Sequence, residues 1–103
     1  MKPHEYVIME IARERERQIS VEGWSADHDD GHPNGELAQA AGCYALHAGQ
    51  PEPAQVRPGY APQEWPWDAK WWKPTDRRRN LVKAGALIVA EIERLDRAAK
   101  NSS

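Results

Sequence analysis

Residues 75–99, TDRRRNLVKAGALIVAEIERLDRAA, constrain the fold more than any other stretch, because they form the longest helical pattern and contain no proline. Their large apolar residues recur at spacings of three and four, which places them on one broad side of a helix. These residues are Leu81, Val82, Leu87, Ile88, Ile92 and Leu95. Thr75 is a suitable N-cap, and Pro74 prevents extension backwards. We therefore predict a long C-terminal helix.

Three consecutive arginines, Arg77, Arg78 and Arg79, occupy the first turn of this predicted helix. Cations are unfavourable there, because the helix dipole places partial positive charge at the N-terminus. One interpretation is an anion pocket, in which guanidinium groups lie beside free backbone N–H groups. The other is that the arginines pair with acidic side chains elsewhere, such as Asp29 and Asp30. The sequence leaves both open.

Two further helices are predicted, over residues 4–19 and 35–48. The first has an apolar face and a run of alternating charges that suits a solvated surface. Arg15 falls on the apolar side by spacing, so it needs a partner or a ligand. The second is rich in alanine, which permits close packing against another helix, and Asn34 is its expected N-cap.

Residues 50–74 form a connection that contains six of the eight prolines. We predict a mobile loop over residues 50–64 and no regular helix beyond one turn within residues 68–72. No convincing pair of strands is present. The expected fold class is mainly α: a single helical domain over residues 1–103, with three main helices and a long Pro/Trp-rich connection before the last one.

Composition limits the classes of partner. The net charge of −2 gives no bulk attraction to nucleic acid, so any anion site must be a local cluster. The lone Cys43 excludes an internal disulfide framework, and it suits a small core residue of a cytosolic protein. No signal peptide and no apolar run of membrane-spanning length is present. We expect a cytoplasmic protein with no membrane partner.

Aromatic usage is unusual, because the chain has five tryptophans and no phenylalanine. Four tryptophans lie within residues 65–72, directly before the arginine cluster. Flat rings beside cations would suit a nucleotide, with stacking for the base and charge for the phosphates. The alternative is that the rings clamp the connection onto the helices, and both roles can coexist.

The loop WSADHDDGHPNG at residues 24–35 is dense in acidic and imidazole groups, which raises the question of a metal. Its spacing matches no EF-hand, HExxH or zinc-finger pattern. An acidic turn that caps the next helix and pairs with arginines explains it better. We therefore expect no metal site and no cofactor.

Three segments resemble a family of small uncharacterised proteins encoded by tailed phages and prophages. They are ERERQISVEGWSADHDD, GELAQAAGCYA and WPWDAKWWKPTDRRRNLVKAGALIVAEIERLDR, which together cover most of the chain outside residues 50–63. The resemblance implies a phage accessory protein made in the bacterial cytoplasm. It does not itself supply a chemistry.

A more distant similarity is to the RyR repeat domain of ryanodine receptors and its bacterial relatives. Gly23-Trp24 and Asp29-Asp30 match that domain in order and approximate spacing, and LVKAGALI resembles its later helix. The tryptophan-rich segment departs from the pattern. This similarity implies a helical module that binds an adenine-type nucleotide.

An enzyme alternative is a MazG-like nucleotide pyrophosphohydrolase, which holds magnesium through an ExxE and a later ExxD motif. Glu93 and Asp96 form an ExxD, but the chain has no ExxE. Without clustered carboxylates on facing helices, metal activation of water lacks its ligands. We expect no catalytic residues, although an enzyme stays open as an alternative.

These observations favour non-catalytic binding of an anionic, nucleotide-like small molecule, with a phage protein sequestering a host immune signalling nucleotide. The alternatives are the pyrophosphohydrolase and a protein-binding inhibitor of a host factor that uses the same surface. A homo-oligomer is expected. The candidate ligand-binding residues are Arg15, Trp24, His28, Trp67, Trp71, Lys73, Arg77, Arg78 and Arg79.

Overall fold

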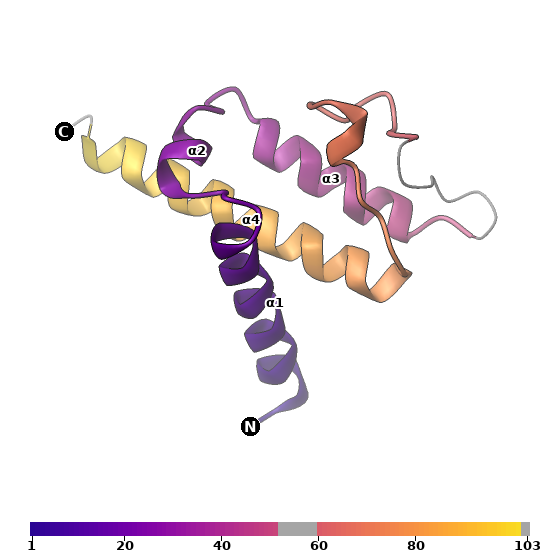
Figure 1. Ribbon diagram of the computed structural model, residues 1–103. Coiled ribbons are helices and arrows are strands. Elements are labelled where there is room, and N and C mark those ends of the chain that lie inside the picture. Colours follow the sequence, from indigo (N-terminus) through magenta and orange to yellow (C-terminus); the bar gives the residue numbers. More distant parts are fainter. Residues whose placement is uncertain (52–59, 102–103) are drawn as a thin grey trace.

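The computed structural model describes residues 1–51 and 60–101, and all regular secondary structure in these ranges is helical (Figure 1). The elements are α1 (Pro3–Ser20), α2 (Ala26–Asp30), α3 (Glu36–Ala48), the 3-10 turn η1 (Ala69–Trp71) and α4 (Arg77–Asn101). The predicted small, mainly helical fold with three long helices is confirmed. Most of the loop predicted at residues 50–64 lies outside the described residues.

The three long helices are arranged as a pair with one projecting arm. α3 and α4 lie side by side and run in opposite directions, whereas α1 crosses α4 steeply and extends away from the pair (Figure 1). The short α2 lies against α4. The radius of gyration is 14.1 Å, compared with about 13 Å expected for a compact domain of 100 residues. The projecting α1 makes the molecule more open than a packed bundle.

The core lies between α3, α4 and the tryptophan-rich segment. Small residues bring the two helices close together, and large rings then cover their contact from outside. The buried cluster consists of Leu37, Ala40, Ala41, Cys43, Tyr44, Trp65, Trp72, Ala84, Leu87 and Ala90. The Tyr44 and Trp72 rings stack with centroids 4.6 Å apart, and the Tyr44 hydroxyl accepts a 3.1 Å hydrogen bond from the Lys73 amide. These contacts anchor the connection onto α3.

The N-caps of α3 and α4 each lie one residue after the predicted cap. α4 begins at Arg77, because Asp76 Oδ1 accepts a 2.8 Å hydrogen bond from the Arg79 amide and acts as the cap in place of Thr75. At α3, the cap position is Gly35 rather than Asn34. Gly35 has a φ of 89°, a left-handed conformation that suits glycine.

The apolar face predicted for α4 divides into two sides. Val82 and Leu87 are buried, whereas Leu81, Ile88, Ile92 and Leu95 are each 49–52% exposed. The side that faces α3 is made largely of alanine, since only small side chains allow the two helices to approach closely. Of the larger residues, Leu87 packs in this contact, whereas Leu81, Ile88, Ile92 and Leu95 lie outside it.

Candidate functional site

A cleft lined mainly by aromatic rings lies between the α1–α2 region and the tryptophan-rich segment. Its volume is about 390 Å³, within the range of about 300–1,000 Å³ that is usual for small-molecule sites. The residues that line this aromatic cleft are Glu22, Trp24, His28, His32, Trp67, Asp68 and Trp71. It is therefore large enough for a ligand of nucleotide size to insert its base.

Four rings form a continuous wall of this aromatic cleft. Trp24 stacks on His28 with centroids 6.0 Å apart and an interplanar angle of 5°. His28 contacts His32 edge-on at 4.9 Å, and His32 lies 5.3 Å from Trp67. The start of α2 fixes the position of His28 in this wall. Ser25 is the N-cap of α2, and its hydroxyl accepts a hydrogen bond from the His28 amide.

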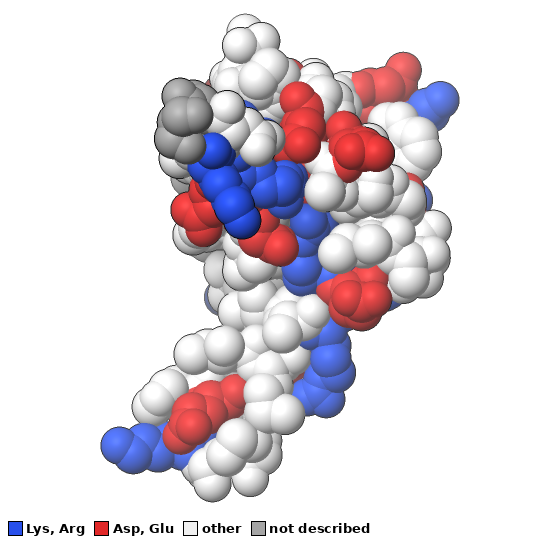
Figure 2. Space-filling model, turned by 90° about the vertical axis from the view of Figure 1, so that its left-hand side faces the viewer, with Lys and Arg blue, Asp and Glu red and all other residues white. Residues whose placement is uncertain are grey.

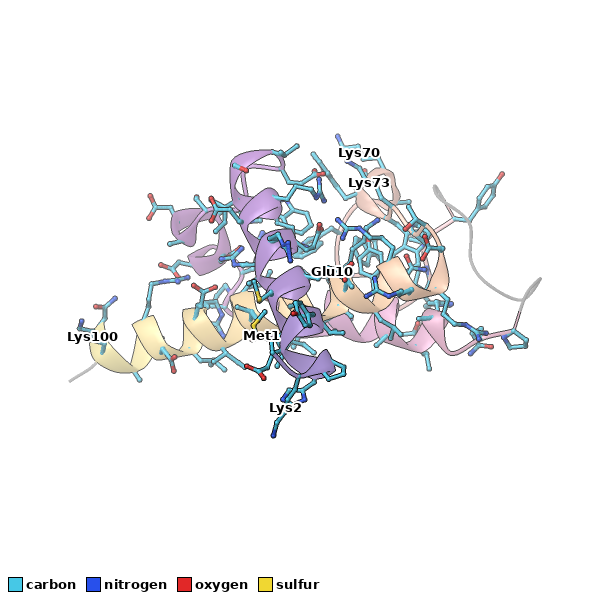
Figure 3. All side chains as sticks on the ribbon, turned by 90° about the horizontal axis from the view of Figure 1, so that it is seen from below. Met1, Lys2, Glu10, Lys70, Lys73 and Lys100 are labelled. Atoms are coloured by element: carbon cyan, nitrogen blue, oxygen red, sulfur yellow. The ribbon has the colours of Figure 1, made fainter. Side chains whose placement is uncertain are left out.

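Charged groups lie at the Trp71 side of the aromatic cleft. The ammonium nitrogens of Lys70 and Lys73 are 5.5 and 5.4 Å from the Trp71 ring centroid. Lys73 Nζ also lies 3.4 Å from Glu22 Oε2. Both lysines extend on the same side of the molecule, near η1 (Figure 3). The aromatic cleft thus offers ring faces, two carboxylate acceptors and two cations.

A second, more open cleft of about 490 Å³ adjoins the first. We call it the basic pocket, and its lining residues are Arg17, Glu22, Lys73, Pro74, Thr75, Arg79 and Lys83. Glu22 lines both clefts, and a small cavity of about 30 Å³ is bounded by residues of each. The two clefts are therefore neighbours.

The buried Glu14 holds two cations of the basic pocket in place. Arg17 donates two hydrogen bonds of 2.8 and 3.0 Å to its carboxylate, and Arg79 donates a further one. Burial acts to raise the pKa of Glu14, but the hydrogen bond and charge of Arg17 and the charge of Arg79 outweigh burial and lower it. Glu14 therefore stays ionised between two fixed guanidinium groups.

Lys83 is a partly buried cation of the basic pocket. Its ammonium donates a 2.6 Å hydrogen bond to the Lys73 carbonyl and lies 5.7 Å from the Tyr44 ring centroid. Burial lowers the pKa of Lys83. The four cations of the basic pocket face only two carboxylates, Glu14 and Glu22, which leaves two positive charges in surplus.

The structure brings together several of the candidate residues. Trp24, His28, Trp67 and Trp71 line the aromatic cleft, and Lys73 lies at its border with the basic pocket. Arg79 lines the basic pocket.

The three consecutive arginines do not converge on one point. Arg78 makes two 2.7 Å hydrogen bonds to Glu10, and Arg77 Nη2 donates a 3.0 Å bond to the Gln50 carbonyl. Neither lines either cleft. Of the two interpretations of the cluster, pairing with acidic or carbonyl groups describes Arg77 and Arg78.

Arg15 also finds its partners inside the protein. It is buried and donates to Asp29 at 2.8 Å, to Glu93 at 2.9 Å and to the Trp24 carbonyl at 3.2 Å. Pairing of Asp29 with the arginine cluster was therefore a wrong expectation. It was also wrong for Asp30, which pairs at 2.9 Å with Arg97. Arg15 of α1 and Arg97 of α4, rather than the arginine cluster, are the basic residues that reach these two aspartates.

Sequence reasoning missed six charged or imidazole residues that line or border the two clefts: Arg17, Glu22, His32, Asp68, Lys70 and Lys83. A signal was present for two of them. Lys83 follows Arg79 by four residues on α4, so the two share a helical side. His32 follows His28 by the same spacing, two residues beyond the end of α2.

The described residues offer neither a metal site nor a membrane-spanning helix. In residues 1–51 and 60–101, no group of three or more His, Cys, Asp or Glu side chains is arranged to hold a metal ion. Glu93 of the ExxD motif is occupied by Arg15. No helix in the same ranges has the length and apolar character to cross a membrane.

Comparison of the chain with protein-family models, curated proteins and solved structures gave no match. The functional argument therefore rests on the geometry and charge of the two clefts.

Proposed function

We propose that this protein binds, without catalysis, an anionic nucleotide-like small molecule whose base enters the aromatic cleft and whose phosphates enter the basic pocket. The observation that carries the proposal is the adjacency of these two clefts, which share Glu22 as a common wall. A nucleotide has the same two-part chemistry, because a flat base is joined to a charged group a few bonds away.

The aromatic cleft supplies the contacts for a base. Stacking of a base on an aromatic side chain contributes about 1–3 kcal/mol and tolerates any base. Trp71 is 39% exposed, so its ring is open to a ligand. The carboxylates of Glu22 and Asp68 can accept hydrogen bonds from an exocyclic amino group or a ribose hydroxyl. They favour a ligand that offers donors at that end.

The basic pocket supplies the contacts for phosphate. Charge-assisted hydrogen bonds contribute about 1.5–3 kcal/mol each, and Arg79 and Lys83 present donors there. Because Glu14 already orients Arg17 and Arg79, less side-chain entropy is lost on binding. A phosphate beside Lys83 would also favour its charged form, opposing the effect of burial.

The biological role that we propose is sequestration of a signalling nucleotide made by host immunity. Support for it comes from the resemblance of the chain to phage-encoded proteins. The alternative roles are a nucleotide pyrophosphohydrolase and an inhibitor that binds a host protein.

The test is capture of a ligand by the purified protein. The protein is incubated with a panel of cyclic ADP-ribose isomers, cyclic di- and trinucleotides, (d)NTPs and the matching nucleosides, with and without magnesium. Free ligand is removed, the protein is denatured, and the released compound is identified by mass spectrometry. Release of an intact nucleotide, with weaker retention of its nucleoside, is the expected result.

Two other outcomes would overturn the proposal. Magnesium-dependent conversion of a triphosphate to a monophosphate would identify a pyrophosphohydrolase instead. Failure to retain any member of the panel would exclude the nucleotide site and favour a protein partner.

A further inference from the structure

Glu22 stands at the junction of the aromatic cleft and the basic pocket, because its side chain lines both. The side chain is only 15% exposed, and each carboxylate oxygen faces one cation. Oε1 accepts a 3.3 Å hydrogen bond from Arg17 Nη1, and Oε2 accepts a 3.4 Å bond from Lys73 Nζ. A ligand that occupies both clefts therefore lies beside this carboxylate.

The charged groups of the basic pocket act on one another. Burial lowers the pKa of Lys83, the charges of Glu14 and Glu22 act to raise it, and those of Arg79 and Arg17 act to lower it. These are the same groups that the hydrogen bonds join in pairs. A phosphate placed in the basic pocket would therefore interact with both carboxylates as well as with the cations.

The two carboxylates differ in how firmly they hold their partners. Glu14 is fully buried, and its bonds to Arg17 are 2.8 and 3.0 Å long. Both bonds of Glu22 are longer than the 2.7–2.9 Å that is usual for a charge-assisted pair, and the Lys73 side chain is 52% exposed. Lys73 can consequently turn to a phosphate, whereas the charge of Glu22 stays beside it.

The surplus of positive charge in the basic pocket is small and local. It amounts to two charges, because four cations face Glu14 and Glu22, while the whole chain has a net charge of −2. On the face shown in Figure 2, basic and acidic side chains are interspersed and form no large area of one sign. A terminal phosphate carries about −1.5 to −2, and each phosphodiester carries about −1. One terminal phosphate or two phosphodiesters thus match the surplus.

We propose that Glu22 selects the ligand by its charge, an inference that rests on the proposed function. The ligand class is a nucleotide with about two negative charges on its phosphates: a mononucleotide with one terminal phosphate, or a dinucleotide, cyclic or linear, with two phosphodiesters. A triphosphate exceeds the surplus, so its additional charge meets the Glu22 carboxylate without a free cation, and like charges side by side are disfavoured. The basic pocket is wide enough for more phosphate, at about 490 Å³, so the limit is electrostatic rather than steric.

The test compares AMP, ADP and ATP by isothermal titration calorimetry. Stacking tolerates any base, so adenine serves as the probe, and magnesium is left out because it would neutralise the added phosphates. The wild type is expected to bind ATP no more tightly than AMP. Glu22→Gln is expected to tighten ATP relative to AMP by about 10-fold or more, because one like charge is removed. Glu16→Gln makes the same chemical change on the exposed side of α1, outside both clefts, and should keep the wild-type ratio.

Repeating the titrations in concentrated salt tests whether charge is the cause. At about 1 M sodium chloride the Debye length falls to about 3 Å, so the gain of Glu22→Gln for ATP should shrink. A gain that persists there would indicate a change of shape and overturn the inference. Tighter binding of ATP than of AMP by the wild type, or an unchanged ratio in Glu22→Gln, would also overturn it while leaving the nucleotide site intact. Failure of all three nucleotides to bind would overturn the nucleotide site and this inference together.

Discussion

The ammonium nitrogen of Lys73 lies 5.4 Å from the centroid of the Trp71 ring and 3.4 Å from Glu22 Oε2. Lys73 therefore stands where the aromatic cleft and the basic pocket meet. A cation near a tryptophan face is attracted by the ring, so Lys73 links the stacking surface to the phosphate contacts.

The stacking role of Trp71 predicts the first mutational result. Trp71→Ala should weaken binding of a nucleotide and of its nucleoside alike, by about 5- to 150-fold, which corresponds to the loss of one stacked base. Isothermal titration calorimetry would measure both. Leu46→Ala, an exposed apolar change on α3, should leave both affinities unchanged. Equal affinities of Trp71→Ala and the wild type would show that Trp71 does not stack on the ligand.

Lys83 should distinguish phosphate recognition from base recognition. Lys83→Met should weaken binding of a nucleotide by at least about 10-fold, the loss of one charge-assisted hydrogen bond, and should leave nucleoside binding unchanged. Arg13→Met removes the same charge from α1 without touching either cleft, so it is the control. A parallel loss for nucleotide and nucleoside would place Lys83 outside the phosphate contacts.

Arg15 should be a large contributor to stability rather than to binding. Arg15→Met leaves the fully buried Asp29 carboxylate without its guanidinium partner, and we expect a loss of about 3–5 kcal/mol in the free energy of unfolding. Urea denaturation would measure it. Arg78→Met breaks an exposed ion pair and should leave the midpoint nearly unchanged. A loss below about 1 kcal/mol for Arg15→Met would contradict the role.

Glu14 predicts a loss of stability in acid. Its pKa in the folded protein is below the ordinary value of 4.5, so the unfolded state binds the proton more readily. The stabilisation is therefore fully present above about pH 4.5 and is lost as the pH falls through the folded-state pKa. Glu14→Gln should be less stable at neutral pH and should lose part of this acid dependence in thermal unfolding. Glu16→Gln, on the exposed side of α1, should keep it.

The contact between Gly85 and Ile11 predicts that the effect of Gly85→Ala on stability depends on the side chain at position 11. Gly85→Ala should destabilise the wild type, because the added Cβ would lie 2.9–3.2 Å from three carbons of Ile11. In an Ile11→Ala background the same substitution should instead stabilise by about 1 kcal/mol, the difference in helix propensity between alanine and glycine. A double-mutant cycle by chemical denaturation measures the coupling. Additive changes in the free energy of unfolding would show that Ile11 does not contact α4 at Gly85.

The long helices could be predicted from the sequence because their periodicity is local. α2 could not, since its five residues carry no apolar repeat and its stability depends on the Ser25 cap and the Arg15–Asp29 pair. The partners of the three arginines could not be predicted for a related reason. Arg79 and Glu14 are 65 positions apart, so only the crossing of α1 over α4 decides which acid each arginine meets.

The candidate site shows the same division. Residue type pointed to the tryptophans as a class, and Trp24, Trp67 and Trp71 do line the aromatic cleft. It could not show that Trp65 and Trp72 belong instead to the buried core. Arg17 and Lys83 carry no such signal, since each belongs to a charged helix that resembles an ordinary solvated surface. Their place in the basic pocket depends on how far α1 lies from α4, which no local pattern encodes.

α4 contacts α3 on one side through Leu87 and Ala90, and it contacts α1 on another through Gly85. A third side carries charges that join α4 to α1 and α2. A helix used on so many sides has few positions at which sequence drift is neutral. Saturation mutagenesis should therefore find that α4 tolerates far fewer substitutions than the exposed N-terminal part of α1, residues 3–9. Divergence among related chains should be slowest in α4, and α4 is the segment from which distant relatives would be recognised.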